Sequence, residues 1–219
     1  MKSLKTPLRY PGGKSRACVK LDQYIPDLRD YTEYREPFLG GGSVALYITK
    51  KYPNLKIWVN DLYEPLYNFW RVLQDPRDGY KMYKRLQELK SRYPDRGSAK
   101  GLFLEAKDTV NDYNESDLFR ATAFYVVNKC SFSGLTESSS FSAQASDSNF
   151  SMRGIEKLPG YTQLIKNWKI TNWSYEGLLT DSKDVFTYLD PPYDIRDNLY
   201  GRKGSMHNGF NHDDFAADC

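Results

Sequence analysis

The chain has 219 residues, of which 40% are hydrophobic and 27% are charged, and its formal net charge is +3. This balance is typical of a globular protein and argues against an intrinsically disordered chain. No apolar run is long enough to cross a bilayer, and residues 1–14 lack the apolar centre of a signal peptide. We therefore expect a cytoplasmic protein without membrane contact. The mildly basic charge is compatible with a polyanionic partner but does not identify one.

The cysteines and histidines argue against a metal site. Cys18, Cys130 and Cys219 are the only three cysteines, and their wide spacing is typical neither of a disulfide framework nor of a zinc site. The two histidines, His207 and His212, have no thiol near them in the sequence. We therefore expect no bound metal.

The predicted elements of the first third form one βαβ unit. Apolar residues at helical spacing predict a first helix over 15–28. The unit itself then follows as a strand, a glycine turn, a helix and a second strand, over 32–38, 40–42, 43–51 and 56–59. This order of elements predicts an α/β sheet.

The middle of the chain, 64–128, has helical spacing. Apolar residues mark two helices, over 66–73 and 80–89. Ser116 or Asp117 is a suitable cap for a third helix, because short polar side chains accept hydrogen bonds from a helix N-terminus. A mainly helical block therefore follows the βαβ unit.

Beyond this block the pattern returns to strands. A serine-rich stretch without clear periodicity, 131–151, is expected to be a loop. Strand-like runs follow at 168–171 and 185–189, so the helical block looks like an insertion between two halves of one α/β domain. We expect a core made of two segments, 1–63 and 165–219, and an insertion over 64–164.

A glycine-rich turn, Gly40-Gly41-Gly42, joins the first strand to the next helix. Glycines suit such a turn when it needs positive φ or when a ligand approaches bare backbone. Asp61 follows about 20 residues later at the end of the next strand, the spacing at which an acid reaches the ribose hydroxyls of a bound nucleoside. We favour nucleoside binding over a turn that only joins a strand to a helix.

The last strand-like run ends at Asp190-Pro191-Pro192-Tyr193. A strand that simply stops at proline is the plain alternative, but it does not explain an acid and an aromatic ring on one fixed turn. The exocyclic amine of a base is a poor nucleophile because its lone pair is delocalised, and acceptors for both hydrogens would localise that pair. Asp190 supplies one acceptor, and the Pro191 carbonyl, aimed by proline's fixed φ, supplies a second. Tyr193 offers a stacking face.

Four motifs in order resemble those of the Dam-type DNA adenine methyltransferases of the alpha group: Tyr10 with Gly12-Gly13-Lys14, Glu36-Pro37-Phe38 with the glycine turn, Asn60-Asp61, and the tetrapeptide at Asp190. The resemblance spans nearly the whole chain. It implies a Rossmann-like class I methyltransferase core with a mixed, mainly parallel sheet and a helical target-recognition insertion. It also implies methyl transfer from S-adenosylmethionine to adenine N6 in double-stranded DNA, after the base has flipped out of the duplex.

The resemblance also assigns roles to residues. The tetrapeptide from Asp190 to Tyr193 matches the catalytic one, and Phe38 matches the ring beside the cofactor's adenine. No metal and no covalent intermediate are required, because the methyl donor is already an activated sulfonium. Lys14 is assigned on resemblance alone. The candidate cofactor contacts are Tyr10, Lys14, Phe38, Gly40, Gly42, Asp61 and Asp190.

The segment 128–135 looks like the family's DNA-contacting segment, in which an aromatic ring, here Phe132, enters the space left by the flipped base. The alternative is that Phe132 and Leu135 bury against the preceding helix. GATC-specific relatives carry a guanine-reading arginine where this chain has Glu137. A carboxylate cannot donate to guanine but accepts from a cytosine amine, so we expect a target other than GATC. The candidate DNA contacts are Asn128, Phe132, Ser133, Leu135 and Glu137.

Other functions stay open in the sequence. The tetrapeptide chemistry also suits cytosine N4, RNA adenine or a glutamine amide, although aspartate at its first position favours adenine in the families that the chain resembles. Such a core has seven strands, and about three beyond the strand of Asp190 are missing. We expect a truncated chain, a sheet completed by another polypeptide, or a remnant that binds DNA or cofactor without catalysis. A cognate restriction endonuclease is a candidate partner, and no oligomeric state is predicted.

Overall fold

The computed structural model describes residues 5–10, 12–134, 139–193 and 210–219. The strands in this part form one four-stranded sheet in the order β3-β2-β1-β4, and every pair is parallel. The expected Rossmann-like α/β class is therefore confirmed, with a sheet that is wholly parallel where the chain is described. The strands are β1 (Glu33–Glu36), β2 (Lys56–Asn60), β3 (Lys169–Thr171) and β4 (Val185–Thr187).

The central strand β1 is the point at which the strand order reverses. The chain runs from β1 outward to β2 and β3, and then returns to place β4 on the opposite side of β1. Tyr34 in β1 is aligned with Ile57 in β2 and with Phe186 in β4. Its fully buried ring stacks on that of Phe186 with the centroids 6.2 Å apart. Ligands of open α/β sheets bind at such a reversal, beyond the carboxyl ends of the strands.

The helices nearest the sheet agree with the prediction in one case and differ in the other. Helix α2 (Ser43–Lys51) has the predicted bounds. Helix α1 (Cys18–Leu21) is much shorter than the helix predicted over 15–28. Pro26 disfavours helical backbone at the residue before it, and the chain forms a separate 3-10 turn, η1 (Leu28–Asp30), instead.

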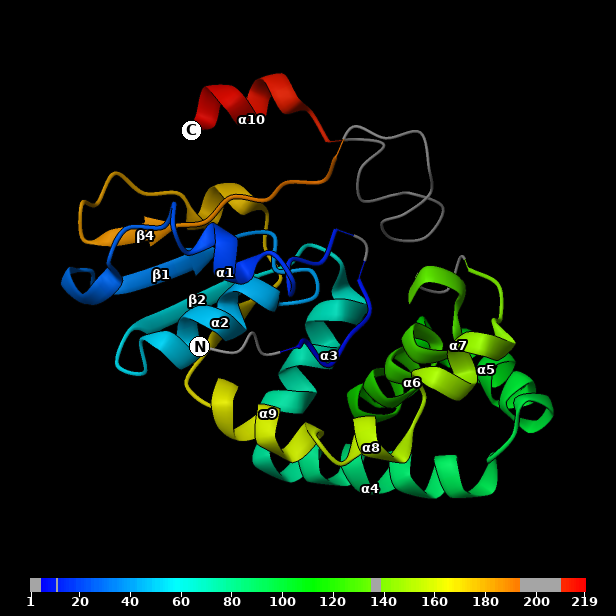
Figure 1. Ribbon diagram of the computed structural model, residues 1–219. Coiled ribbons are helices and arrows are strands. Elements are labelled where there is room, and N and C mark those ends of the chain that lie inside the picture. Colours follow the sequence, from blue (N-terminus) through cyan, green and yellow to red (C-terminus); the bar gives the residue numbers. More distant parts are fainter. Residues whose placement is uncertain (1–4, 11, 135–138, 194–209) are drawn as a thin grey trace.

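The helical block lies to one side of the sheet in Figure 1, and α10 (His212–Asp218) lies at the end of the molecule away from α4 and α9. None of the helices in the described ranges is long and apolar enough to cross a membrane. The block consists of α3 (Glu64–Gln74), α4 (Pro76–Arg92), α5 (Arg96–Val110), α6 (Asp117–Cys130), the 3-10 turn η2 (Phe132–Gly134), α7 (Ala143–Ser148), α8 (Met152–Ile155) and α9 (Leu158–Ile165).

Four of these helices, α5, α7, α8 and α9, were not predicted from the sequence. Helix α5 contains Gly97 and Gly101, which weaken its helical signal because glycine is a poor helix former. Helix α7 lies inside the stretch 131–151, which was expected to be a loop, so that expectation was wrong for six residues. The helix begins there because the Ser142 side chain accepts a hydrogen bond from the Ala145 N–H at 3.2 Å.

One cluster of buried side chains runs from the sheet into the helical block. Phe69 and Trp70 in α3 are both fully buried. The Trp70 ring lies 5.7 Å from that of Trp168, just before β3, and Phe69 stacks at 6.1 Å on Tyr125 in α6. Each such aromatic pair contributes about 0.5–1.5 kcal/mol beyond the burial of its area. The division of the chain at residues 64 and 164 stays a prediction, because this shared core sets no packing boundary there.

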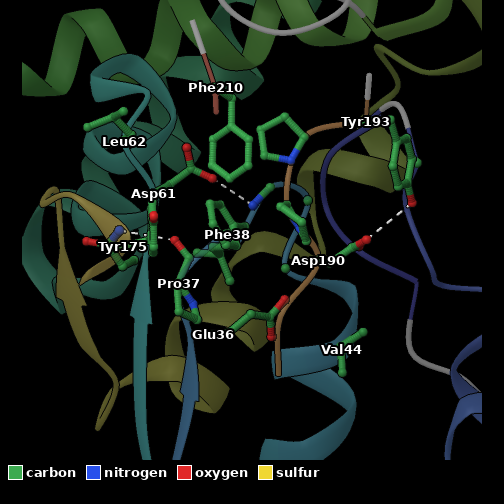
Figure 2. Close-up of a pocket in the computed structure, with 18 of the residues that line it drawn as sticks. Glu36, Pro37, Phe38, Val44, Asp61, Leu62, Tyr175, Asp190, Tyr193 and Phe210 are labelled. Carbon is green, nitrogen blue, oxygen red and sulfur yellow. Dashed lines mark hydrogen bonds between the residues drawn. The ribbon is translucent and has the colours of Figure 1, made fainter. Parts of the chain in front are cut away.

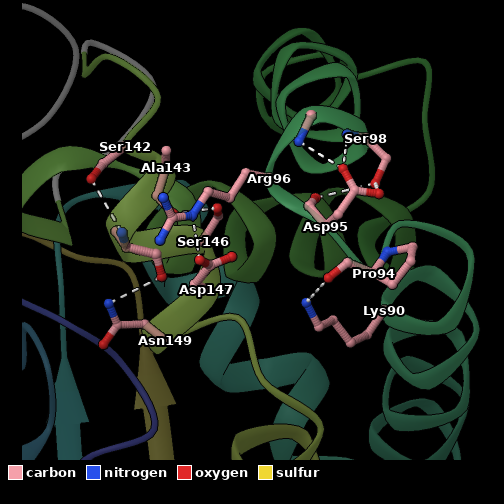
Figure 3. A network of polar contacts seen from close by, with 12 residues as sticks. Lys90, Pro94, Asp95, Arg96, Ser98, Ser142, Ala143, Ser146, Asp147 and Asn149 are labelled. Atoms are coloured by element: carbon pink, nitrogen blue, oxygen red, sulfur yellow. Dashed lines mark hydrogen bonds and ion pairs between the residues drawn. The ribbon is translucent and has the colours of Figure 1, made fainter.

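Polar contacts hold α7 beside the turn between α4 and α5 (Figure 3). Arg96 at the start of α5 forms an ion pair with Asp147 in α7. Lys90 Nζ donates to the Pro94 carbonyl at 3.1 Å, and Asp95 caps α5 by accepting two backbone N–H groups. Exposed pairs of this kind contribute at most about 1 kcal/mol each, so their main effect is to orient α7.

Candidate active site

The carboxyl ends of β1, β2 and β4 border a cavity of about 610 Å³. Three predicted segments line it: the glycine turn that follows β1, the acid that follows β2, and the tetrapeptide that follows β4. The reversal of strand order at β1 places the cavity where α/β sheets bind their ligands. Every candidate cofactor residue lines this cavity, namely Tyr10, Lys14, Phe38, Gly40, Gly42, Asp61 and Asp190.

The glycine turn needs glycine for two separate reasons. Gly40 has a φ of 49° and Gly42 a φ of 68°, which is left-handed backbone that other residues rarely adopt. A Cβ on Gly40 would lie 2.8 Å from Tyr10 Cε1, and a Cβ on Gly42 would lie 2.8 Å from Trp70 Cζ2. Gly40 therefore packs against the Tyr10 ring and Gly42 against the Trp70 ring, and both glycines also line the cavity.

Asp61 closes the glycine turn from the end of β2. Its Oδ2 accepts the Gly40 N–H at 2.8 Å, and its Oδ1 accepts the Tyr63 N–H at 3.0 Å. Burial raises the pKa of Asp61 to about 6, although these two hydrogen bonds act to lower it. Figure 2 shows the carboxyl group at the cavity wall near Phe38. Each oxygen has lone pairs left to accept from a ligand's hydroxyl groups.

Asn60, beside Asp61, ties three strand ends together and was not among the predicted site residues. Its side chain is 1% exposed. The Nδ2 group donates to the carbonyls of Pro37 and Trp173 at 3.1 and 2.9 Å, and Oδ1 accepts from Thr171 Oγ1 at 2.8 Å. This role has no local sequence signal, because its partners lie at or just beyond the ends of β1 and β3 and meet only in the folded sheet.

Lys14 joins the N-terminal segment to the tetrapeptide. Its Nζ lies 2.5 Å from Asp190 Oδ2 and 2.6 Å from the Tyr193 hydroxyl, and that hydroxyl donates to Asp190 Oδ1 at 3.2 Å. Burial lowers the pKa of Lys14, but the bonds to Asp190 and Tyr193 outweigh it, so its pKa lies above the ordinary value. The lysine is therefore charged at neutral pH and forms an ion pair with Asp190.

The remaining tetrapeptide side chains lie at the cavity mouth. Pro191 and Pro192 are half-buried, and both line the cavity. The Tyr193 side chain is 43% exposed, so one part of its ring is free for a ligand while its hydroxyl is held by Lys14. This agrees with the stacking face that we predict for a base, although the stacking itself stays a prediction.

Aromatic rings cover the cavity around Phe38 (Figure 2). The centroid of Phe38 lies 5.6 Å from that of Tyr175, in η3 (Tyr175–Leu178), and 5.7 Å from those of Phe210 and Phe215. The Tyr175 hydroxyl donates to Asp218 Oδ2 at 2.6 Å, which fastens α10 to η3. Phe38 was predicted from the resemblance, whereas the other three rings are isolated aromatics without a sequence signal.

Glu36, the last residue of β1, places an acid under the catalytic end of the cavity. Its side chain is 3% exposed, and Tyr34 Oη donates to its Oε2 at 2.6 Å. Burial raises the pKa of Glu36 to about 8 and the charge of Asp190 adds to the rise, whereas Tyr34, the Ala45 N–H and Lys14 oppose it. Glu36 belongs to the motif Glu36-Pro37-Phe38 of the family resemblance, but it was not predicted as a site residue.

Because the pKa of buried Glu36 is raised, we expect the free energy of unfolding to depend on pH. The folded state holds a proton on Glu36 up to about pH 8, whereas the ordinary value is 4.5, so stability should fall as the pH rises through this window. The loss is up to about 1.4 kcal/mol per pH unit. Urea unfolding between pH 6 and 8 should show this slope in the wild type and a shallower one in Glu36→Gln, which keeps an acceptor for Tyr34. Equal slopes would contradict the assignment.

The structure describes part of the predicted DNA-contacting segment. Phe132, in η2, is 64% exposed, which removes the alternative that its ring buries against α6. Asn128 is instead 1% exposed, with its amide bonded to backbone groups. Ser133 contributes backbone to η2, while Leu135 and Glu137 lie outside the described residues. A contact of any of these residues with DNA stays a prediction.

The cysteines do not come together in the fold. Cys18 and Cys130 are buried free thiols, and Cys219 is an exposed one. Burial raises the pKa of the Cys18 thiol to about 11, so this thiol is not a ready nucleophile. Within the described ranges, no three His, Cys, Asp or Glu side chains form a group that could hold a metal ion.

Comparison with known proteins places this chain in a family. A family model described as D12 class N6 adenine-specific DNA methyltransferase matches residues 10–216. The Type II methyltransferase M.MjaIII of Methanocaldococcus jannaschii is 27% identical over 203 residues, which are 87% of this chain and 69% of the relative. A DNA adenine methylase of Vibrio cholerae is 25% identical over 221 residues, which cover 99% of this chain and 75% of that protein.

A third relative matches a shorter part of the chain. The DNA N-6-adenine-methyltransferase of Escherichia phage P1 is 30% identical over 129 residues, or 58% of this chain and 15% of that protein. The family match is broader, since it begins at Tyr10 and ends inside α10. It therefore includes the glycine turn, Asp61 and the tetrapeptide in one span. The chain belongs to the D12 class of N6 adenine-specific DNA methyltransferases.

Proposed function

We propose that the cavity binds S-adenosylmethionine, the methyl donor that the family implies, with its ribose at Asp61 and its adenine beside Phe38. The fit rests on three observations. Gly40 and Gly42 line the cavity and carry no side chain that could project into it. The Asp61 carboxyl group lines the cavity and has lone pairs for hydroxyl groups. Phe38 and its neighbouring rings offer an apolar surface to a planar base.

The charges around the cavity also suit this ligand. Lys14 is the only lysine or arginine among the described residues that line the cavity, and carboxyl groups are far more frequent there. A wall rich in carboxylates favours a cationic sulfonium centre, and Lys14 offers a contact for the ligand's own carboxylate. The acids that line the cavity are Asp61, Glu176, Asp190, Asp214 and Asp218, together with Glu36, which holds its proton up to about pH 8 and so adds no charge at neutral pH.

The chain's own contribution to the reaction is to prepare the adenine amine. When bound, the cofactor supplies a methyl group on a positively charged sulfur. Asp190 accepts a hydrogen bond from one hydrogen of N6, and the Pro191 carbonyl accepts one from the other, which localises the nitrogen's lone pair. Lys14 holds the Asp190 side chain in place through their ion pair, and Tyr193 stacks on the base. The observation that carries the proposal is that Asp190 and the glycine turn share one cavity.

The substrate we propose is duplex DNA with the target adenine turned outward, and Phe132 fills the space that the base leaves. The exposed ring on a short, anchored turn supports this role. Ser133, Leu135 and Glu137 follow as candidate contacts on the same segment, and Glu137 is the reason that we propose a target other than GATC. A restriction endonuclease with the same target is the partner that such a methyltransferase would protect DNA against.

Removing the Phe132 ring is expected to impair base flipping without unfolding the protein. Phe132→Ala should change the free energy of unfolding by less than about 0.5 kcal/mol, since the ring is exposed. It should lower kcat/KM on paired adenine by about 5- to 100-fold, the value of one stacking contact. The loss should be smaller on DNA in which the adenine is mismatched, because flipping then costs less.

Tyr80→Ala is the matched control, because Tyr80 is a 59% exposed ring on α4. Methyl transfer should be measured for both variants on the paired and the mismatched duplex. An equal loss for Phe132→Ala on both substrates would show that the ring does not act in flipping. Full activity of Phe132→Ala on paired DNA would remove Phe132 from the proposal.

A further inference from the structure

The buried side-chain amide of Asn128 forms two hydrogen bonds with the backbone of Arg9. Asn128 Oδ1 accepts the Arg9 N–H at 2.9 Å, and Asn128 Nδ2 donates to the Arg9 carbonyl at 2.6 Å. One side chain thus pairs with both backbone polar groups of one residue, as a neighbouring β-strand would. The other Nδ2 hydrogen donates to the Gly134 carbonyl at 3.0 Å, so the amide also holds the end of η2. Its acceptor and both donors are engaged.

Two more contacts join Arg9 to the same turn. Arg9 Nη1 donates to the Ser131 carbonyl at 2.8 Å. Gly134 has a φ of 73°, and a Cβ there would overlap Arg9 Cβ and lie 2.7 Å from the Arg9 carbonyl oxygen. Arg9 therefore contacts the turn on both sides of Phe132, through its guanidinium at Ser131 and through its backbone at Gly134, while the Phe132 N–H donates to the Ser140 carbonyl at 3.1 Å.

The residues that follow Arg9 belong to the cofactor cavity. The Tyr10 ring lies against the glycine turn, since a Cβ on Gly40 would be 2.8 Å from it. The Tyr10 carbonyl accepts the Gly13 N–H at 3.1 Å, and Lys14 then reaches Asp190 at 2.5 Å. A single short segment thus contacts the exposed Phe132 turn at one end and both the cofactor turn and the catalytic acid at the other.

We propose that Asn128 is a positioning residue that couples occupancy of the cofactor cavity to the Phe132 turn, so that bound cofactor and bound duplex DNA strengthen each other. The inference rests on the proposed function of the cavity and of Phe132. A ligand that restricts the motion of Tyr10 also restricts that of its neighbour Arg9. Because the Asn128 amide is bonded both to Arg9 and to the Gly134 carbonyl, η2 is restricted as well. Because coupling between two sites is reciprocal, either ligand tightens the other by the same factor.

The test measures this factor directly. The test uses an unmethylated duplex that contains the sequence that the enzyme methylates. The dissociation constant of this duplex is measured with and without saturating S-adenosylhomocysteine, the reaction product, which has no methyl group to transfer. In the wild type we expect duplex binding about 10-fold tighter with S-adenosylhomocysteine, within the usual range of such couplings. In Asn128→Ala the factor should fall below about 2, while S-adenosylhomocysteine alone binds with nearly unchanged affinity.

Asn68→Ala is the matched control. Asn68 is 4% exposed in α3, and its Nδ2 donates to the Asp117 carbonyl at 3.0 Å, a contact within the helical block that does not reach Arg9. This variant should lose stability in the same way as Asn128→Ala but keep the full coupling factor. A reduced factor in both variants would mean that general loosening, and not the grip on Arg9, sets the coupling.

A second variant guards against failure of Asn128→Ala to fold. Arg9→Ala removes the hydrogen bond from the guanidinium to the Ser131 carbonyl but keeps the two backbone hydrogen bonds to Asn128. It should therefore lower the coupling factor at least twofold. A wild-type factor of 1 would overturn the coupling while the proposed function stands. A full factor in Asn128→Ala, or in Arg9→Ala where Asn128→Ala does not fold, would overturn it as well. Wild-type protein that binds neither S-adenosylhomocysteine nor the duplex would overturn the proposed function and the coupling together.

Discussion

Replacing Asp190 with alanine is expected to abolish methyl transfer while leaving the fold largely intact. The Asp190 carboxylate follows β4 and lines the cavity, and we assign it one of the two hydrogen bonds that localise the amine's lone pair. Loss of one such group in other enzymes costs about 100- to 1,000-fold in rate. Transfer of a labelled methyl group to DNA measures the loss, and circular dichroism with urea unfolding measures the fold.

The Asp190 result needs a control for the ion pair that it breaks. Asp147→Ala removes a more exposed ion pair, that of Asp147 with Arg96 in the helical block (Figure 3). This variant should keep wild-type activity, because its pair does not line the cavity. Asp190→Asn separates charge from shape: it keeps an oxygen acceptor but weakens the attraction to Lys14, so we expect a loss smaller than that of alanine. Undiminished activity of Asp190→Ala would remove Asp190 from the mechanism.

Placing alanine at Gly42 is expected to destabilise the fold and weaken cofactor binding together. The left-handed backbone at Gly42 costs a residue with a Cβ about 1–2 kcal/mol, and the contact with Trp70 costs about 1–3 kcal/mol more. The loss should total about 2–5 kcal/mol in the free energy of unfolding, since the Trp70 ring is fully buried and has little room to move. Urea unfolding and titration with S-adenosylhomocysteine measure the two effects.

Gly101→Ala is the control for this substitution. Gly101 lies inside α5, and a Cβ there meets no atom within 4 Å. Alanine should stabilise that helix by roughly 0.5–1 kcal/mol, because glycine is the poorer helix former. Two changes of the same chemistry thus have opposite predicted signs. A Gly42→Ala protein as stable as the wild type would show that the turn has room to relax.

Local patterns predicted the parts of the fold that depend on neighbouring residues. The start of α2 follows from the glycine turn before it, and Ser116 caps α6 by accepting the Phe119 N–H at 3.4 Å, as expected. Helix α1 was predicted too long because its apolar spacing continues past Pro26, which ends helical backbone. Helix α7 was missed because serines were interpreted as a loop, although Ser142 is its cap.

The site residues also fall into those that a local motif predicts and those that depend on distant partners. The glycine turn, Asp61 and the tetrapeptide were predictable because each is a local motif at a strand end. The pairing of Lys14 with Asp190 joins residues 176 positions apart, and before the fold was known Lys14 rested on the family resemblance alone. Asn60 and Tyr175 were not predicted, since their partners lie on other elements. The Asn128 side chain was predicted to contact DNA, and only the fold reveals its bonds to Arg9.

The position of the transferred methyl group tests the proposed function most directly. Purified protein is incubated with methyl-labelled S-adenosylmethionine and duplex DNA, and modified bases are mapped by sequencing, with Asp190→Ala in parallel. We expect N6-methyladenine in one sequence context other than GATC, and none with Asp190→Ala. Methylation within GATC would contradict the proposed target. Label on cytosine, RNA or protein, or no transfer although the cofactor binds, would contradict the assignment of this cavity as an adenine N6 methylation site.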